Sequence, residues 1–257
     1  MTEPVTPKPS EKKPVKQHDL METVQFAWFV GHLVTLISVI FYSLTFIRIG
    51  HRTQFFWFYL ATLGIIESFG ILIFQLVSKK SLQVSGLLKD DNTQYFLLGC
   101  FFLLLRPHIM LPLLPFGLFS AFHVLAYTRG HLLPVFGLAD SPIAAQVGHF
   151  VNNNNTKSIQ VASLLEIISW VWLLVRVITF RKRSLTPFLV YSLFLKLRFE
   201  KSVFTRNHVK RLELRIESAV NNANNPTVKN IWIQFKDVAR RIGAITLVND
   251  YSKEKST

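Results

Sequence analysis

The chain is poor in acidic residues and in cysteine. It has 15 Asp and Glu against 29 Lys and Arg, and its one cysteine, Cys100, cannot form a disulfide within the chain. Nothing therefore indicates an oxidising compartment, and a single Cys in an apolar run is usually a small hydrophobic residue. The basic excess is compatible with nucleic acid, with anionic lipid, or with the orientation signal of a membrane protein.

Motifs that carry chemistry are also missing. The eight histidines show no HxxH, HxxxH or HExxH spacing, and the sequence has no glycine-rich phosphate loop, GxSxG motif or DHHC-like cluster. We therefore predict no metal, no cofactor and no enzymatic activity. His32 and His123 lie in apolar segments, where we expect them to be hydrogen-bonding core residues.

Long apolar segments are what the sequence has instead. Segments of about 20 residues match the roughly 30 Å hydrocarbon core of a bilayer. We predict an all-α, polytopic membrane protein with about four transmembrane helices, a broken third element and C-terminal amphipathic helices. For such a chain, lipid and orientation explain the basic charge better than nucleic acid does, so no nucleic-acid partner is expected. The membrane domain covers 26–180, with spans at about 26–47, 55–77, 108–127 and 159–180.

The third apolar region, residues 95–127, is the difficult one, because it contains "LLLRPHIMLPLLP". It is too long for one upright span and too short for two spans with a turn. A single span over 95–114 would leave Arg106 near the middle of the bilayer, at about 2.5–3.5 kcal/mol. We therefore favour a break in the helix near this arginine.

The favoured version has a short interfacial helix over about 95–105, preceded by the helix-start sequence "KDDNT" and ending at Arg106. Pro107 then occupies the first turn of a helix over 108–127, where its missing N–H is harmless. Pro112 and Pro115 are expected to kink or loosen the first half of that span. A connection over about 128–157 follows.

Charge predicts which side the tails face. Sixteen of the 29 Lys and Arg follow Phe180, and four more precede the first span. Four crossings place both tails in one compartment, and basic residues near spans favour the cytosol. Both termini are therefore expected to be cytosolic. Residues 1–25 are expected to be a disordered tail without a cleavable signal peptide.

Residues 181–248 are expected to form cytosolic or interfacial helices. The first, "LTPFLVYSLFLKLRF", is short for a crossing and predicts an interfacial or docked helix. In the last, an apolar stripe either packs on a neighbouring helix or the membrane domain, or inserts into the bilayer interface with its cations on anionic lipid. The second interpretation predicts a membrane-binding site of Ile231, Trp232, Phe235, Lys236, Val238, Arg240, Arg241 and Ile242.

Two short signals complete the survey. In the flexible tail 249–257, "KEKST" places Lys253 and Lys255 in the pattern of a dilysine ER-retrieval signal. Asn154 begins a glycosylation sequon on the predicted luminal side, close against the fourth span.

Three ionisable residues, Glu67, Glu166 and Arg176, lie inside apolar segments. In the structural interpretation, Glu67 or Glu166 pairs across helices with Arg106 or a hydroxyl, while Arg176 reaches the interface. The alternative is a small channel or transporter that uses Glu67, Glu166 and Arg106. The absence of a transporter-type internal repeat favours the structural interpretation.

Two stretches carry a family resemblance. "LPFGLFSAFHVLAYT" at 114–128 and "TPFLVYSLFLKLRFEKSVFTR" at 186–206, followed by "LELRI", resemble the transmembrane protein 33 family. The resemblance extends from the first span to about Val220. The matching positions are Pro107, Pro115, Phe119, Ser120, His123, Tyr127, Thr128, Glu166, Pro187, Phe188, Tyr191, Leu195, Leu197, Arg198 and Arg206.

The resemblance implies a membrane protein of the endoplasmic reticulum and nuclear envelope without known enzymatic activity. It implies roles in shaping the ER membrane and in nuclear pore complex organisation, which helices inserted into one leaflet are suited to support. The expected partners are membrane lipids, reticulon-type ER-shaping proteins, nucleoporins or an import receptor. The oligomeric state stays open.

Overall fold

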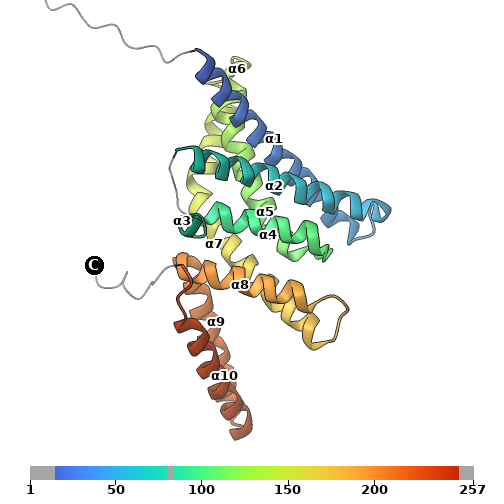
Figure 1. Ribbon diagram of the computed structural model, residues 1–257, viewed down its shortest axis with the longest axis vertical. Coiled ribbons are helices and arrows are strands. Elements are labelled where there is room, and N and C mark those ends of the chain that lie inside the picture. Colours follow the sequence, from blue (N-terminus) through green and yellow to red (C-terminus); the bar gives the residue numbers. More distant parts are fainter. Residues whose placement is uncertain (1–14, 80–83, 249–257) are drawn as a thin grey trace, which may run out of the picture.

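The computed structural model describes residues 15–79 and 84–248, and every regular element in these residues is a helix (Figure 1). Four helical stretches are long and apolar enough to cross a membrane, namely Glu22–Thr45, His51–Ser78, Leu111–Val135 and Pro142–Ile178. The predicted all-α, polytopic membrane protein with four spans is confirmed. The main helices are α1 Val15–Thr45, α2 Gln54–Lys79, α4 Asp91–Leu105, α5 Leu114–Tyr127, α7 Pro142–Ile178, α8 Leu185–Lys201, α9 Val203–Asn222 and α10 Pro226–Ala244.

α1 begins earlier than the apolar pattern predicted. Residues 15–25, assigned to a disordered tail, are its first turns, while its membrane-crossing part begins at Glu22. The stretch "VKQHDLMETV" contains no Gly or Pro and several good helix formers, so a helix can extend past the apolar boundary. Hydrophobicity marks where a span begins but not where its helix begins.

α1 and α2 form an antiparallel hairpin whose close approach depends on glycine. A Cβ atom on Gly64 would lie 2.6 Å from Thr35 Oγ1 and 2.8 Å from the Gly31 carbonyl oxygen. Small residues at such a crossing allow tight packing, which drives helix association where lipid is as apolar as the side chains. The Thr35 hydroxyl donates to the Gly31 oxygen at 2.8 Å, so no hydroxyl is left unsatisfied there.

The third element is broken, as predicted. α4 ends in a left-handed cap at Arg106, with φ 48°, and the next helical turn begins at Leu111. Pro107 therefore lies inside the break, not in the first turn of the new helix as predicted. Pro112 is the second residue of η2 (Leu111–Leu113) and Pro115 is the second residue of α5, where no intrahelical N–H is needed. They start these helices and do not kink a continuous one.

The predicted connection over 128–157 is largely helical. α5 continues through a π-helical turn, η3 (Thr128–Leu132), into α6 (Leu133–Val135). α7 then begins at Pro142, where the Ser141 hydroxyl accepts a hydrogen bond from the Ala144 N–H at 3.2 Å. With 37 residues, α7 is about 56 Å long and exceeds the roughly 30 Å bilayer core. Its polar first half, predicted as part of a connection, is helical although its sequence lacks an apolar period.

The core lies where α2, α4, α5, α7 and α8 meet. The rings of Phe69, Tyr95, Phe116 and Phe194 are buried there, with Tyr95 at 5.5, 5.6 and 5.4 Å from the other three. α8 lies beside α4, below it in Figure 1, and packs against both α4 and α7, and its Tyr191 and Phe194 are buried. α8 is thus a docked helix. Beyond it, α9 and α10 form a hairpin that extends away from the membrane domain, at the bottom of Figure 1.

Candidate functional site

α10 presents its apolar stripe outward. Ile231, Phe235, Val238 and Ile242 are 62, 53, 56 and 56% exposed, and no residue of α10 is buried. The stripe therefore packs neither on α9 nor on the membrane domain. The interpretation in which it packs on a neighbouring helix or on the membrane domain is wrong. An exposed row of large apolar side chains is typical of a surface that meets a membrane or a partner.

The opposite flank of α10 contacts α9. Lys236 Nζ lies 2.7 Å from Glu217 Oε1, and Arg240 Nη2 lies 4.0 Å from Glu213 Oε1. Lys236 also lies over the ring of Trp232, 5.8 Å from its centroid, and this ring is half-buried. Two members of the predicted site, Trp232 and Lys236, are thus directed toward α9. Arg241 is exposed, and Arg240 is 70% exposed despite its neighbour.

The end of α10 is fastened to α8. Lys196 Nζ donates to the Gly243 carbonyl oxygen at 2.9 Å, and the backbone N–H groups of Leu247 and Val248 donate to the Glu200 carboxylate at 2.8–3.2 Å. Glu200 is fully buried and also pairs with Lys196 at 3.0 Å. We call this the latch. It holds the C-terminal end of the α9–α10 hairpin against α8, and no sequence motif predicted it.

A buried polar network joins α4, α7 and α8. The Tyr95 hydroxyl donates to Glu166 Oε1 at 2.5 Å, and Arg198 Nε lies 3.6 Å from Glu166 Oε2. The same guanidinium reaches Asp91 Oδ2 at 3.1 Å and lies over the Tyr95 ring at 5.1 Å. Glu166 and Arg198 are 1% and 4% exposed. Since a buried charge without a partner is very unfavourable, these contacts fix α7 against α8.

The network keeps its arginine charged. Burial alone lowers the pKa of the Arg198 guanidinium, but its acidic neighbours, among them the Glu166 and Asp91 carboxylates, raise that pKa by more, above the ordinary arginine value. Burial also raises the pKa of the Tyr95 hydroxyl well above its usual value. Tyr95 therefore stays a donor to Glu166 at physiological pH.

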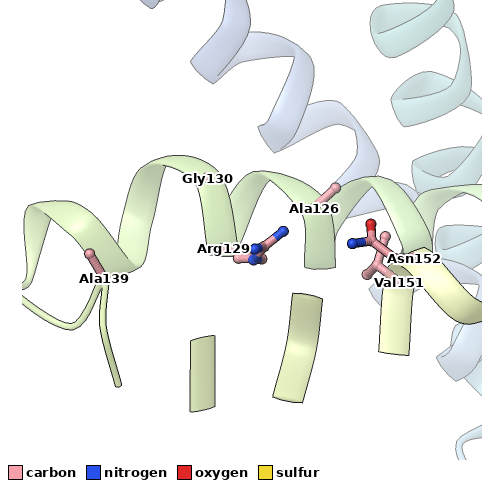
Figure 2. A pocket seen from close by; sticks show the side chains of 6 residues that line it. All are labelled: Ala126, Arg129, Gly130, Ala139, Val151 and Asn152. Carbon is pink, nitrogen blue, oxygen red and sulfur yellow. The ribbon is translucent and has the colours of Figure 1, made fainter. Parts of the chain in front are cut away.

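No catalytic set accompanies these features. In the described residues, no three His, Cys, Asp or Glu side chains are grouped as a metal site. A cavity of about 350 Å³ lies between the end of α5 and α7, with Arg129 of η3 and Asn152 of α7 on its wall (Figure 2). Its other lining residues are Ala126, Gly130, Ala139 and Val151, so it brings together one cation and one amide but no nucleophile or acid–base pair.

Comparison with known proteins identifies the family of this chain. A family model described as transmembrane protein 33/nucleoporin POM33 matches residues 7–242. The chain belongs to this family. The family predicted from the two sequence stretches is thus confirmed, and the match includes both the latch-bearing α8 and most of α10.

Curated relatives of the transmembrane protein 33/nucleoporin POM33 family match over most of the chain. Nucleoporin POM33 of Chaetomium thermophilum is 30% identical over 274 residues, covering 95% of both chains. Tetra-spanning protein 1 of Schizosaccharomyces pombe is 32% identical, covering 93% of this chain and 91% of its own. Pore membrane protein of 33 kDa of Saccharomyces cerevisiae is 33% identical, with 80% and 78% covered. No solved structure matches the chain.

The second stretch with the family resemblance, residues 186–206, forms most of α8 and the start of α9. Glu166 and Arg198, 32 positions apart in the sequence, form the ion pair of the buried network. Arg206 of α9 donates to the Glu200 backbone oxygen at 2.9 Å, which satisfies a carbonyl at the end of α8. Pro187 and Tyr191 are buried and Leu197 is half-buried. These residues, which were predicted as family positions, attach α8 and α9 to the membrane domain.

The first family stretch packs against α1. His32 Nδ1 and Ser120 Oγ are hydrogen-bonded at 3.0 Å, and the His32 and His123 rings lie 4.5 Å apart. Tyr127 stacks on Phe29 at 4.6 Å. His32 is fully buried, so it is the hydrogen-bonding core residue that we predicted. These contacts join α5 to α1.

The residues proposed for a channel do not meet. The partners of Glu166 are the Tyr95 hydroxyl and Arg198, so pairing with a hydroxyl was right and pairing with Arg106 was wrong. Arg106 instead lies over the Tyr59 ring at 5.6 Å. Glu67 is exposed on α2. The three residues occupy three separate places and line no shared path.

Two further predictions concern the chain's short signals. Lys253 and Lys255 lie outside the described residues. Asn154 lies within α7, where its side-chain amide donates to the Phe150 oxygen at 2.9 Å, so the sequon is part of a regular helix.

Proposed function

We propose that this protein is a non-enzymatic, multi-pass membrane protein of the endoplasmic reticulum and nuclear envelope that supports nuclear pore complex organisation and helps to shape the ER membrane. Relatives named nucleoporin POM33, pore membrane protein of 33 kDa, and pore and endoplasmic reticulum protein of 33 kDa support this location. The outward apolar stripe of α10 carries the mechanistic part of the proposal.

The stripe suits insertion into one leaflet. Four large apolar side chains along one face are each more than half exposed, and full burial of such a side chain gives roughly 1.5–3 kcal/mol. Arg241, which is exposed and forms no ion pair with α9, adds about 1 kcal/mol near an anionic surface. A helix that enters only the headgroup boundary widens one leaflet more than the other and so favours curvature.

Two sets of contacts support the proposal that the end of this helix lies close to the membrane domain. The latch ties the end of α10 to α8, and the buried network ties α8 to the fourth span. With four spans, both ends lie on one side, and the positive-inside rule assigns that side to the cytosol. Proposed partners are membrane lipids, reticulon-type proteins, nucleoporins and an import receptor, while Lys253 and Lys255 stay a predicted retrieval signal.

An environment-sensitive fluorophore tests the insertion. In a Cys100→Ser background, Phe235→Cys on α10 is labelled, and the full chain is reconstituted into anionic or neutral liposomes. We expect blue-shifted emission and quenching by lipid-borne quenchers with anionic lipid, because the stripe then enters the interface.

Leu214→Cys on α9 is the matched control, since Leu214 is 57% exposed and lies outside the stripe. Its fluorophore is expected to stay in water in both kinds of liposome. Identical spectra at positions 235 and 214 would remove lipid insertion from the proposal. They would leave recruitment of a protein partner as the role of the stripe.

A further inference from the structure

Glu67 lies near the middle of the second span and faces outward. It is exposed on α2, and within the described part of the chain its carboxyl forms no hydrogen bond or ion pair. Ionisable residues inside spans almost always face the bundle interior or pair with another group. Glu166 follows this rule by binding Tyr95 and Arg198, and Glu67 departs from it.

The face around Glu67 has the spacing of a helix–helix seam. Residues spaced alternately four and three apart, as at the a and d positions of a heptad repeat, lie on one face of a helix. One such series runs along α2. Four of the large apolar residues in this series are 57, 51, 65 and 48% exposed, namely Phe56, Leu63, Phe74 and Val77. The complete series is Phe56, Leu60, Leu63, Glu67, Gly70, Phe74 and Val77. Within it, Leu60 and Gly70 are half-buried, and Gly70 lies against the Phe96 ring of α4.

We propose that this seam binds the same seam of a second copy, with the two Glu67 carboxyls hydrogen-bonded to each other across a two-fold axis. Copies in one membrane share one orientation, so the axis runs along the membrane normal and places equal residues at equal depth. A protonated carboxyl donates to its partner, and neither group then needs any other residue.

A second copy fits better than an unrelated helix. Another partner would have to carry its own polar group at the same depth in the bilayer, unfavourable in its own right. Two copies of Glu67 remove both unpaired groups at once. A single polar residue at an a position also fixes the register and the number of helices in a parallel pair.

Cysteine cross-linking of the full chain in native membranes tests the interface. In a Cys100→Ser background, Leu63→Cys is expected to give a disulfide-linked product of twice the chain mass on oxidation. Ile37→Cys is the control, because Ile37 is 40% exposed on α1, and the contact of Thr35 with Gly64 puts it near the depth of Leu63. It is expected to give little product.

Substitutions of Glu67 in the Leu63→Cys protein then test the hydrogen bond. Glu67→Leu is expected to lower the product about 5- to 30-fold, which corresponds to one interhelical hydrogen bond of about 1–2 kcal/mol. Glu67→Gln is expected to keep most of it, because an amide both donates and accepts.

Three results would overturn the proposal. The first is equal cross-linking at positions 63 and 37, and the second is undiminished cross-linking in the Glu67→Leu protein. The third is a cross-linked product that contains a different protein. Both Glu67 variants are compared at equal amounts of membrane-inserted chain, so a change in product reports association and not expression.

Discussion

Folded proteins usually bury apolar side chains and expose charged ones. The α4–α7–α8 junction and the α10 helix both depart from this rule, in opposite ways. At the junction, Glu166 and Arg198 are charged and buried, and each finds its partner within the chain. On α10, Ile231 and Phe235 are apolar and exposed, and no part of the described chain covers them. The first region is complete by itself and holds the architecture. The second leaves large apolar side chains uncovered, and we propose that the membrane interface covers them.

The largest expected effect comes from breaking the junction. Arg198→Met leaves the Glu166 carboxylate buried without its cation, so we expect the protein to lose about 3–5 kcal/mol of unfolding free energy. Chemical unfolding in detergent micelles measures this. Adding Glu166→Leu is expected to restore most of the loss, because no unpaired charge remains. Failure of the double variant to recover would mean that the network does more than pair two charges.

Opening the latch is expected to have a smaller and more local effect. Glu200→Ala removes the acceptor of two backbone N–H groups and the partner of Lys196, at about 2–3 kcal/mol for hydrogen bonds to a charged group. Hydrogen exchange of residues 245–248 should accelerate by about 30- to 150-fold, while exchange in α2 should not change. Uniform acceleration along the whole chain would contradict a local latch.

Asp91 is the solvent-exposed member of the buried polar network, so its substitution tests whether burial decides the effect on stability. The Asp91 side chain is 48% exposed, so Asp91→Asn is expected to lower the unfolding free energy by less than about 1 kcal/mol, although the residue contacts both Arg198 and Lys201. The same detergent unfolding measurement applies. A loss as large as that of Arg198→Met would mean that Asp91, and not Glu166, is the main partner of the arginine.

The smallest effect on stability is expected on the stripe. Phe235→Glu with Ile242→Glu changes side chains that are 53 and 56% exposed, so the unfolding free energy in detergent should shift by less than about 0.5 kcal/mol. The same pair should abolish the lipid-dependent fluorescence shift of a fluorophore at Val238→Cys. A large loss of stability would show that the stripe packs within the chain after all.

How much the sequence predicted depended on the kind of signal. The long apolar segments predicted the four spans, and Arg106 with its neighbouring prolines predicted the broken third element. Both predictions depend only on residues that are close together in the sequence. The polar first half of α7 was missed, since its helix carries no apolar period and is stabilised by packing on α5. The amphipathic stripe of α10 was visible from spacing alone, but spacing did not reveal that Trp232 and Lys236 turn toward α9.

By itself, the sequence determined that this chain enters a membrane four times and ends in amphipathic helices, because hydrophobicity and its period act on neighbouring residues. The sequence also indicated Glu166 and Arg198 as positions that match the family pattern, but it did not indicate that they form an ion pair. Only the tertiary structure decided that these two residues meet, that Glu200 fastens the end of α10, and that Glu67 has no partner among the residues that the structure describes. Pairing between distant residues depends on how helices cross, and no local pattern encodes the crossing.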